Sequence, residues 1–496
     1  MPQKKQLARN SGIYFIINIL QRVSNFLVSV LLARTLGPSN FGIFSLAQTV
    51  KNFSQKIGMF GLGLNAQKDF SGKVNNEQYK KISQYILINL VFAISIPLLV
   101  VLLSSTIANN VFDEPQLEIV LKYFSIIIGV SIVSNFLVSL HRAKRNLRDV
   151  FYTQLIEGFF KFIILLVLTT VIELKLLHVI YIYTTVVFFQ FIYIVIKSTK
   201  LDLFNGIRIR KLPAIAFPNK GMLILGAETT IISMGYFFNH QLDRLMLGFF
   251  DNATVVGQYV AIVAIVEVIS VVQNSMQNAL MPMISESYKN KNYEDIKLSY
   301  FFMVKIVTFL NFVFAIFAIS FGPLIIKLLY GEQYLNSSIS LVLTLLVFIK
   351  FVSSWAGPTG ATLLMTGNTK YEFMNTSSTI IINIIANTIF IYYMDLDIVG
   401  AALATFMAMV VINIIQLFQI KKTLLFKPIS KFQISVMALF VLFLITQIYL
   451  SITFLVQFIL VLFFSLLVTV VEWWFLSISD KTFLRNKILS KLKKGK

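Results

Sequence analysis

The chain contains no cysteine and few charged residues, and both absences narrow its class. Among its 496 residues there are 0 Cys and 3 His, and charged residues make up 13% of the total, whereas soluble domains carry about 25%. Without cysteine there can be no disulfide, no thiolate nucleophile and no Cys-ligated zinc. The histidines His141, His178 and His240 stand far apart in the sequence, which argues against a histidine metal site.

Local motifs of covalent chemistry are also missing from the sequence. It has no Gly-x-x-x-x-Gly-Lys-[Ser/Thr] phosphate loop, no Gly-x-Ser-x-Gly and no His-Glu-x-x-His. ATP hydrolysis by a known local motif is therefore excluded, and active transport would have to draw on an ion gradient or on substrate flux. We expect a protein that is not an enzyme, with no cofactor other than Na⁺ or H⁺ as a coupling ion.

Apolar runs dominate what is present. Hydrophobic residues make up 57% of the chain, 47 of them phenylalanine. Runs of about 20 apolar residues are long enough to cross a bilayer as helices. The sequence therefore predicts an all-α polytopic membrane protein with 14 transmembrane helices. The predicted spans are 12–33, 41–63, 82–104, 118–140, 150–172, 178–196, 221–248, 257–282, 300–320, 338–362, 373–393, 399–420, 432–451 and 454–476.

The placement of Lys and Arg supports this division, because cytoplasmic loops collect positive charge. On the side shared with the N-terminus the loops and tails hold 32 Lys and Arg, whereas the opposite side holds three, Arg34, Lys175 and Lys327. An error in the number of spans would have mixed the two sides. We therefore expect a multi-pass protein of the cytoplasmic membrane with both termini cytoplasmic. The net charge of +21 follows mostly from this topology and requires no nucleic acid partner.

One helix–turn–helix pattern occurs twice and predicts two related halves. In the stretch Leu32 to Val50, LARTLGPSNFGIFSLAQTV, an Arg and a Gly precede a polar turn that is followed by Gly42-x-Phe44. In Leu242 to Ile265 the same order ends in Gly257-x-Tyr259. A duplicated helical unit is common in transporters. The predicted domains are an N-terminal lobe (1–196), a basic cytoplasmic linker (197–220), a pseudo-symmetric C-terminal lobe (221–422), two accessory helices (432–476) and a basic tail (477–496).

Polar residues follow one face of several spans, and the sequence predicts that these faces line an aqueous cavity. A charge near mid-bilayer costs about 2.5–3.5 kcal/mol on insertion scales, so such residues usually face protein or water. Polar stripes can also hold helices together through hydrogen bonds, and for the Asn and Ser positions that alternative stays open. The candidate substrate-binding residues of the first two spans are Asn18, Arg22, Asn25, Gln48, Lys51, Gln55 and Lys56.

The sign of the in-span charge differs between the halves. The first half holds Arg22 and Lys51 without an obvious local partner, and a cationic cavity favours an anion such as a phosphate. Glu157 and Lys161, four residues apart, are expected to pair. The second half holds in-span carboxylates that are candidates for coupling to a cation or a proton, or for salt bridges with the first-half cations. These carboxylates are Glu228, Asp243 and Glu267.

Three stretches carry a resemblance to a known family. LARTLGPSNFGIFSLAQTV, LDRLMLGFFDNATVVGQY and MPMISE (Met281 to Glu286) resemble the polysaccharide (Wzx-type) flippases of the multidrug/oligosaccharidyl-lipid/polysaccharide exporter superfamily. The resemblance implies two six-helix lobes, a central cavity and alternating access. It also implies that the chain moves polyprenyl-pyrophosphate-linked oligosaccharide repeat units across the membrane for surface polysaccharide biosynthesis, beside a polymerase and glycosyltransferases as partners.

The resemblance also implies particular sites. In the similar lipid II flippase, arginines of the first helix bind pyrophosphate, and Arg22 lies at a matching place. That relative has a sodium site whose residue types and spacing are matched here by Asp243, Asn383, Asn387 and Thr405. Asn387 stands where the relative has an acid, which reduces the negative charge of such a site. The two accessory helices are implied to flank a groove for the polyprenyl tail.

Two other functions compete with this one. A multidrug/cation antiporter of the same superfamily is expected to have twelve helices and an acidic cavity for cationic drugs, and the sequence departs from both. A membrane-embedded glycosyltransferase or ligase acting on the same lipid carriers needs a sizeable extramembrane loop with catalytic acids or histidine, and none of the loops is long enough.

Overall fold

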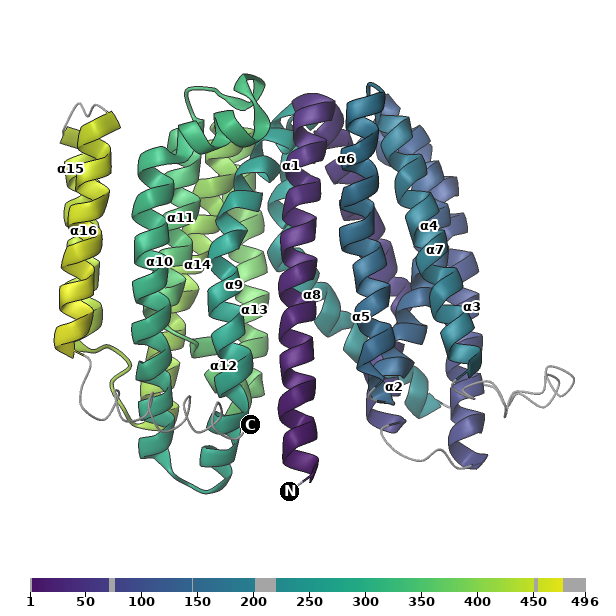
Figure 1. The fold of residues 1–496 in the computed structure, drawn as a ribbon, viewed down its shortest axis with the longest axis horizontal. Coiled ribbons are helices and arrows are strands. Elements are labelled where there is room, and N and C mark those ends of the chain that lie inside the picture. The colour runs from purple at the N-terminus through teal and green to yellow at the C-terminus, as the bar shows by residue number, and fades with distance from the viewer. Residues whose placement is uncertain (1, 71–75, 145, 201–219, 450–453, 476–496) are drawn as a thin grey trace, which may run out of the picture. The chain divides into compact units, whose positions relative to one another are not determined.

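Long apolar helices make up the whole described structure. A computed structural model describes residues 2–70, 76–144, 146–200, 220–449 and 454–475, and every regular element in those ranges is a helix (Figure 1). The all-α class predicted from the sequence is thereby confirmed. The predicted linker 197–220 and tail 477–496 fall largely outside the described residues.

The chain divides into two compact units. Unit 1 comprises Met1–Ala264, Leu329–Tyr334 and Ile391–Ala401, and unit 2 comprises Ile265–Leu328, Leu335–Phe390 and Ala402–Lys496. Unit 1 therefore contains α8 (Lys220–Phe250) and the beginning of α9 (Ala253–Lys289) in addition to the predicted N-terminal lobe. The predicted lobe boundaries at 196 and 221 stay a prediction.

The helices of unit 1 are α1 (Pro2–Met59), α2 (Leu62–Asp69), α3 (Asn76–Ser105), η1 (Thr106–Val111), α4 (Pro115–Ala143), α5 (Leu147–Leu155), η2 (Ile156–Phe160), α6 (Lys161–Val171), α7 (Leu176–Lys200), α8 (Lys220–Phe250) and the start of α9 (Ala253–Lys289). Several long helices of unit 1 run side by side, among them the three labelled α3, α4 and α7 (Figure 1).

Unit 2 holds the rest of α9 and the later helices. They are α10 (Tyr293–Tyr330), α11 (Ile339–Ala356), α12 (Thr359–Met365), α13 (Thr369–Asn387), η5 (Thr388–Tyr393), α14 (Asp397–Leu424), α15 (Lys431–Tyr449) and α16 (Phe454–Phe475), with a short turn η4 (Glu332–Tyr334) before α11. The turn η4 and parts of α10, η5 and α14 belong to unit 1.

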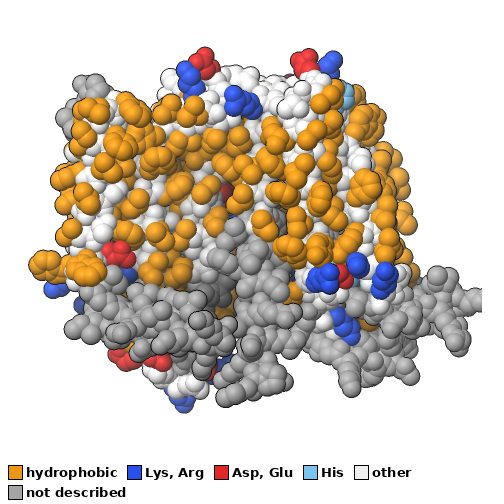
Figure 2. Space-filling view, in the orientation of Figure 1, with side chains coloured by type: hydrophobic (Ala, Val, Ile, Leu, Met, Phe, Trp, Pro, Cys, Tyr) orange, Lys and Arg blue, Asp and Glu red, His pale blue; other side chains and the backbone are white. Residues whose placement is uncertain are grey.

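In the described part of the chain, twelve helices are long and apolar enough to cross a membrane. Two features separate this number from the fourteen predicted spans. The first two spans lie in the single element α1, and the thirteenth is represented by a shorter apolar helix, Lys431–Gln447. The predicted span 338–362 is broken into α11 and α12 at Gly357, whose φ of 90° ends the helix, and at Pro358. Hydrophobic side chains cover the faces of the helices and charged ones gather toward their ends (Figure 2).

The element α1 contains a sharp bend. Gly37 has φ 73° and ψ 170°, outside the helical region, and Pro38 follows it. A positive φ is accessible to glycine because it lacks a Cβ, and proline cannot continue the hydrogen-bond ladder of the preceding helix. The polar turn read from the sequence therefore joins two helical arms of α1.

The repeated Gly-x-aromatic motifs meet in unit 1. A Cβ on Gly42 would overlap the carbonyl oxygen of Ala253, and a Cβ on Gly257 would overlap the carbonyl oxygen of Pro38. The second arm of α1 and the start of α9 thus cross with backbone against backbone, as small residues allow in membrane helices. The duplicated glycines that pointed to two related halves are the two sides of this crossing.

A π-helical turn divides the predicted span 150–172. The turn η2 lies between α5 and α6 and contains Glu157. A π turn adds a residue to the helical turn and shifts the faces that follow it, and such turns are frequent at functional sites. No feature of the local sequence predicts it.

The helix α15 is held against α11 in unit 2 by hydrogen bonds at Gln433 and by contacts between aromatic rings. The amide of Gln433, at the start of α15, donates to the carbonyl of Trp355 at 2.7 Å, and the indole of Trp355 donates to the carbonyl of Gln433 at 2.7 Å. Further along, Phe440 stacks on Phe351 with ring centroids 4.1 Å apart. Because both groups lie on α11 and α15, they fix α15 against the unit.

Candidate functional site

Two adjoining cavities lie inside unit 1. The larger has a volume of about 680 Å³ and the smaller about 460 Å³, and both are lined by Asn52 and Glu157. The two arms of α1 contribute to each, since Gln21 and Lys56 line the larger and Asn25 and Lys51 the smaller. The arms therefore run back alongside one another, and the polar faces predicted for the first two spans share one interior space.

Basic side chains outnumber acidic ones around these cavities. Among the described residues that line them, five are Lys or Arg and one, Glu157, is acidic. Amides and hydroxyls supply much of the remaining wall. The basic residues are Lys51, Lys56, Arg142, Lys161 and Arg244. An interior with this excess of positive charge attracts an anion.

Glu157 interacts with two of the lysines. Its carboxylate accepts a hydrogen bond of 3.2 Å from the amide of Gln190 and interacts electrostatically with both Lys51 and Lys161. The ammonium of Lys161 lies over the ring of Tyr183, 4.4 Å from its centroid. One carboxylate thus faces two cations, which leaves a net positive charge in the smaller cavity.

The expected Glu157–Lys161 ion pair is wrong. Among the described residues, no carboxylate oxygen lies within the 4.0 Å of an ion pair from the Lys161 nitrogen. The π turn η2 contains Glu157 and ends directly before Lys161, so it changes the spacing of the two side chains around the helix. Lys161 takes the face of an aromatic ring instead, a contact worth about 2 kcal/mol when it is shielded from water.

The structure brings most of the predicted substrate-binding residues together. Asn25, Gln48 and Lys51 line the smaller cavity, and Gln55 and Lys56 line the larger. Arg22 is exposed and lines neither cavity. The side chain of Asn18 lies outside the described residues. Binding of substrate by any of these residues stays a prediction.

The candidate binding residues read from the sequence did not include several polar residues of the wall. Arg142, Gln190 and Arg244 line the cavities, and Arg244 donates to the side-chain oxygen of Gln241 at 3.0 Å. The available signal was their type, because a charged or amide side chain inside an apolar span needs a polar environment. Residue type alone does not show toward which neighbouring helix a side chain points. Arg142 also follows the predicted end of its span and therefore falls in a predicted loop.

The candidate ion-coupling residues fall in both units. In unit 2 the amide of Asn387 donates to Asn383 at 2.9 Å, and Asn383 donates to Thr405 at 3.1 Å. In unit 1 the carboxylate of Asp243 accepts a hydrogen bond of 2.7 Å from the hydroxyl of Tyr259. The asparagine and threonine pattern is therefore a connected group, and its joint use with Asp243 stays a prediction.

The other two candidate acids have different surroundings. Glu267 forms an ion pair of 2.7 Å with Lys350, both in unit 2, whereas Glu228 is exposed. The sequence had left open a salt bridge between these acids and cations of the first half. Glu267 pairs with Lys350, a cation of the second half, instead of with a cation of the first half.

An apolar groove lies on unit 2 between α11 and α15. Its volume is about 530 Å³. Its lining is aliphatic apart from one indole, and comprises Trp355, Ile434, Met437, Ala438, Val441, Leu442 and Ile445. A surface of this kind fits a hydrocarbon chain rather than a polar ligand.

Comparisons with known proteins identify the family. The family described as "Polysaccharide biosynthesis protein" matches residues 7–288, more than half of the chain, and the MatE family matches residues 223–389. A search of curated proteins gave no significant match. The chain is a multi-pass membrane transporter of the multidrug/oligosaccharidyl-lipid/polysaccharide exporter superfamily and not an enzyme. Within that superfamily it belongs to the polysaccharide biosynthesis protein family.

Solved structures show the same fold at low identity. The lipid II flippase MurJ in an inward closed conformation gives a TM-score of 0.67 at 17% identity, over 96% of this chain and 100% of that one. An inward-facing multidrug resistance MATE family transporter gives 0.67 at 12% identity, over 82% and 94%. The outward-facing conformation of a MATE family transporter gives 0.56 at 14% identity, over 85% and 96%.

Proposed function

We propose that the protein is a flippase that moves polyprenyl-pyrophosphate-linked oligosaccharide repeat units across the cytoplasmic membrane by alternating access. The observation that carries this proposal is the excess of five basic residues over one acidic residue around the cavities of unit 1. A buried cationic space would be costly to maintain without an anionic ligand. Membership of the polysaccharide biosynthesis protein family and likeness in fold to a lipid II flippase support the same substrate class.

The cavities offer a separate surface for each part of such a substrate. Lys51 and Lys161, which share Glu157, supply the positive charge for the pyrophosphate. Lysine binds phosphate oxygens as a point charge and does not require one fixed geometry. Asn52, Gln55 and their polar neighbours offer hydrogen bonds to sugar hydroxyls. In the proposed cycle, binding of the anion neutralises the cavity and thereby favours the conformation that closes around it.

The groove between α11 and α15 suits the lipid tail. A polyprenyl chain cannot enter a cationic cavity without losing its apolar surroundings, so it needs a hydrophobic path beside the headgroup site. The lining of Trp355, Met437 and the aliphatic residues of α15 provides such a surface. We propose that this groove holds the polyprenyl tail.

The alternative is a multidrug or cation antiporter, and the likeness in fold to MATE transporters supports it. The sign of the cavity lining opposes it, because five Lys and Arg repel a lipophilic cation. Reconstituted protein decides between the two. The assay measures how fast a fluorescent polyprenyl-pyrophosphate N-acetylglucosamine becomes inaccessible to a membrane-impermeant quencher, and in parallel how fast ethidium crosses the vesicle membrane. Transport of ethidium without flipping of the lipid would reject the flippase.

The orientation follows from the positions of Lys and Arg. We expect both termini and the loop at Arg208 to be cytoplasmic, and Asp113 and Glu332 to lie outside, because the first side carries 32 Lys and Arg against three. Alkaline phosphatase fused after Arg208 should be inactive, whereas the same enzyme fused at Asp113 should be active. An active fusion at Arg208 would reverse the assignment.

Coupling to an ion is proposed for Asp243 together with Asn383 and Asn387. A gradient of Na⁺ or H⁺ across the membrane would then drive the transport. We expect Asp243→Asn to lose most gradient-driven flipping, because an amide neither carries the negative charge nor binds the proton. The measurement compares flipping with an imposed Na⁺ gradient, an imposed pH gradient and neither. If Asp243→Asn responds to both gradients as the unmodified protein does, the residue is not the coupling site.

Polymerases and glycosyltransferases that make and consume the lipid-linked repeat unit are proposed as its partners. The chemistry of the substrate requires them, since another protein must build the lipid-linked sugar on one side of the membrane and remove it on the other.

A further inference from the structure

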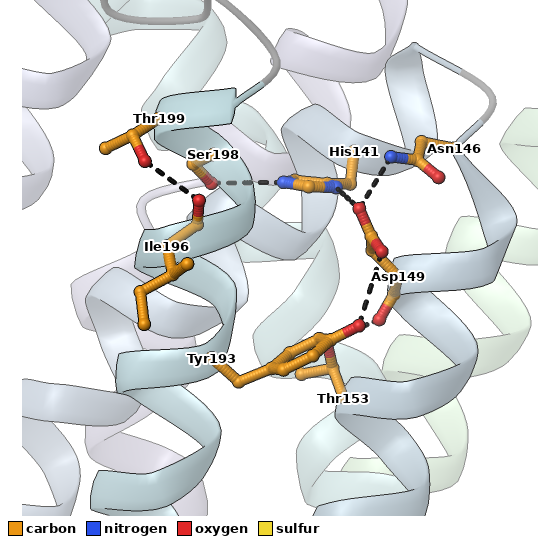
Figure 3. A network of polar contacts seen from close by, with 8 residues as sticks. All are labelled: His141, Asn146, Asp149, Thr153, Tyr193, Ile196, Ser198 and Thr199. Atoms are coloured by element: carbon orange, nitrogen blue, oxygen red, sulfur yellow. Dashed lines mark hydrogen bonds and ion pairs between the residues drawn. The ribbon is translucent and has the colours of Figure 1, made fainter.

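A group of buried polar side chains that line neither cavity joins three helices of unit 1. His141 of α4, Asp149 of α5 and Ser198 of α7 point toward one another, with Asn146 and Tyr193 around them (Figure 3). We call these five residues the His141 network. His141 and Ser198 are fully buried, and Asp149 is 8% exposed. The proposed transport cycle assigns no role to any of them.

The imidazole of His141 has a different contact on each ring nitrogen. Its Nε2 lies 3.0 Å from the hydroxyl of Ser198. Its Nδ1 lies 3.5 Å from a carboxylate oxygen of Asp149, a separation at which a neutral hydrogen bond is weak. The same carboxylate accepts hydrogen bonds from Asn146 at 2.7 Å and from Tyr193 at 3.3 Å. Asp149 is therefore held in place, while its contact with His141 is loose.

The contacts can satisfy either charge state of the imidazole. In the neutral ring one nitrogen donates and the other accepts, and in the charged ring both donate. A serine hydroxyl can rotate to donate to Nε2 or to accept from it. When Nδ1 also carries a proton, it faces a carboxylate that already has two other donors. Uptake of a proton thus leaves no polar atom of this group newly unpaired and converts a loose contact into a buried ion pair.

The connectivity resembles that of a hydrolytic Ser–His–Asp triad, but the surroundings exclude that use. A triad serine has to reach a substrate carbonyl, and the side chain of Ser198 is fully buried and lines neither cavity. The His141 network therefore acts on the positions of the helices that carry it.

Those helices form part of the wall of the larger cavity. Arg142 follows His141 directly and lines this cavity, and so do Thr153 and Gln154 of α5. The hydroxyl of Thr153 donates to the backbone carbonyl of Asp149 at 2.6 Å, so the wall and the network share one turn of helix. A change in the distance between His141 and Asp149 consequently moves α4 against α5 at the Arg142 end of the cavity.

Other charged groups near the His141 network have partners of their own. The guanidinium of Arg148 lies 5.8 Å from the ring centroid of Tyr152, and the ammonium of Lys197 lies 5.5 Å from that of Tyr193. Arg142 on α4 and Lys144 directly after that helix each have further contacts. On the neighbouring helices Asp69 of α2 accepts a hydrogen bond from the hydroxyl of Tyr85 of α3 at 2.7 Å. Burial of the imidazole lowers the pKa of His141, and the charge of Asp149 opposes this shift by favouring the imidazolium.

We propose that His141 is a proton-binding positioning residue: protonation draws α4 and α5 together through Asp149 and so narrows the Arg142 end of the larger cavity. The width of the cavity then follows pH on the side of the N-terminus, the cytoplasmic side in the proposed orientation. The consequence for transport, that loading of the anionic headgroup depends on pH, rests on the proposed function, whereas the movement of the wall does not.

The absence of cysteine from the chain allows a test that needs no substrate. Gln154→Cys places a single thiol on the cavity wall, and its rate of reaction with a membrane-impermeant methanethiosulfonate reagent reports access. The rate is measured between about pH 4.5 and 8, because burial lowers the pKa of His141 below the ordinary histidine value. It is then divided by the rate in Gln154→Cys/His141→Gln, which cancels the titration of the thiol itself. We expect this ratio to fall severalfold as the pH is lowered, along a single-proton curve.

Two further variants distinguish a proton site from a merely structural network. Asp149→Asn keeps the shape of the side chain but removes the charge that favours imidazolium, so the transition should move down by about one pH unit or more. Ser198→Ala removes the Nε2 partner without removing a charge, so the transition should remain. A ratio that does not change with pH would overturn the proposal, as would a transition unmoved in Asp149→Asn. Should His141→Gln fail to accumulate, the Asp149→Asn shift measured against Ser198→Ala decides the matter.

A last arm separates this proposal from the proposed function. If flipping of the fluorescent polyprenyl-pyrophosphate sugar is absent but the labelling ratio still titrates, the flippase assignment fails and the His141 site stands. If the lipid is flipped and the ratio is constant, the reverse holds.

Discussion

Replacing Lys51 by alanine together with Lys161 by methionine should abolish flipping of the polyprenyl-pyrophosphate probe. Each lysine supplies a charge-assisted contact worth about 1.5–3 kcal/mol, or roughly 10- to 150-fold in rate. Loss of both leaves Glu157 and Arg244 as the charged residues that line the smaller cavity, and because these two charges cancel, the site no longer attracts an anion. Neither substitution should impair insertion into the membrane. A lysine inside the bilayer costs about 2.5–3.5 kcal/mol, and an apolar residue does not carry this cost.

Lys122 provides the matched control. It is a lysine of α4 in the same unit, but its ammonium pairs with Glu118 at 2.6 Å on an exposed surface, and exposed pairs contribute about 0–1 kcal/mol. Lys122→Met should therefore flip at nearly the unmodified rate. Glu157→Gln should raise the affinity for the probe, whereas the lysine substitutions should lower it. Flipping by Lys51→Ala/Lys161→Met at the rate of Lys122→Met would show that the cavity does not bind the headgroup.

The second large effect is expected at the crossing of α1 and α9. Gly257→Ala places a Cβ onto the carbonyl oxygen of Pro38, and Gly42→Ala places one onto that of Ala253. Backbone atoms cannot rotate away as a side chain can, so the helices must separate. Overpacking costs typically about 1–3 kcal/mol, and either variant should melt several degrees lower in detergent and lose most flipping.

Non-additivity supplies a sharper criterion for this crossing. Because both substitutions push the same two helices apart, Gly42→Ala/Gly257→Ala should lose less than the sum of the single losses. Gly331→Ala is the control, since a Cβ there meets nothing within 4 Å and the substitution adds only the strain of a φ of 97°. Wild-type melting and flipping in Gly257→Ala would mean that the close crossing has no role in stability or transport.

The positions of the helices could be predicted closely from the sequence because the membrane imposes them. A run of about 20 apolar residues must form a helix to satisfy its backbone in lipid. The predicted spans 82–104 and 118–140 accordingly lie within α3 (Asn76–Ser105) and α4 (Pro115–Ala143). The bend at Gly37 was readable for a similar reason, since Gly-Pro in a polar stretch disfavours a continuing helix.

The sequence predicted which types of residue line the cavities, but it did not predict correctly which individual residues do so. Gln48 and Lys51 share a helical face of the second arm of α1 and line a cavity together with Asn25 of the first arm, whereas Arg22, read from the same pattern as Asn25, is exposed outside both cavities. A helical face can be computed from a period of 3.6 residues. The side of the unit toward which that face points depends on the helices packed around it.

The sequence by itself determined the class of protein, the helices that span the membrane and the kinds of polar residue placed among them. Each of these follows from transfer free energies that act on one residue or one segment at a time. Only the tertiary structure decided that Glu157 interacts with both Lys51 and Lys161 and that His141, Asp149 and Ser198 meet. These arrangements join residues of different helices, and one of them depends on the π turn at Ile156–Phe160. A contact of this kind is set by how several helices pack together, and no single segment contains that information.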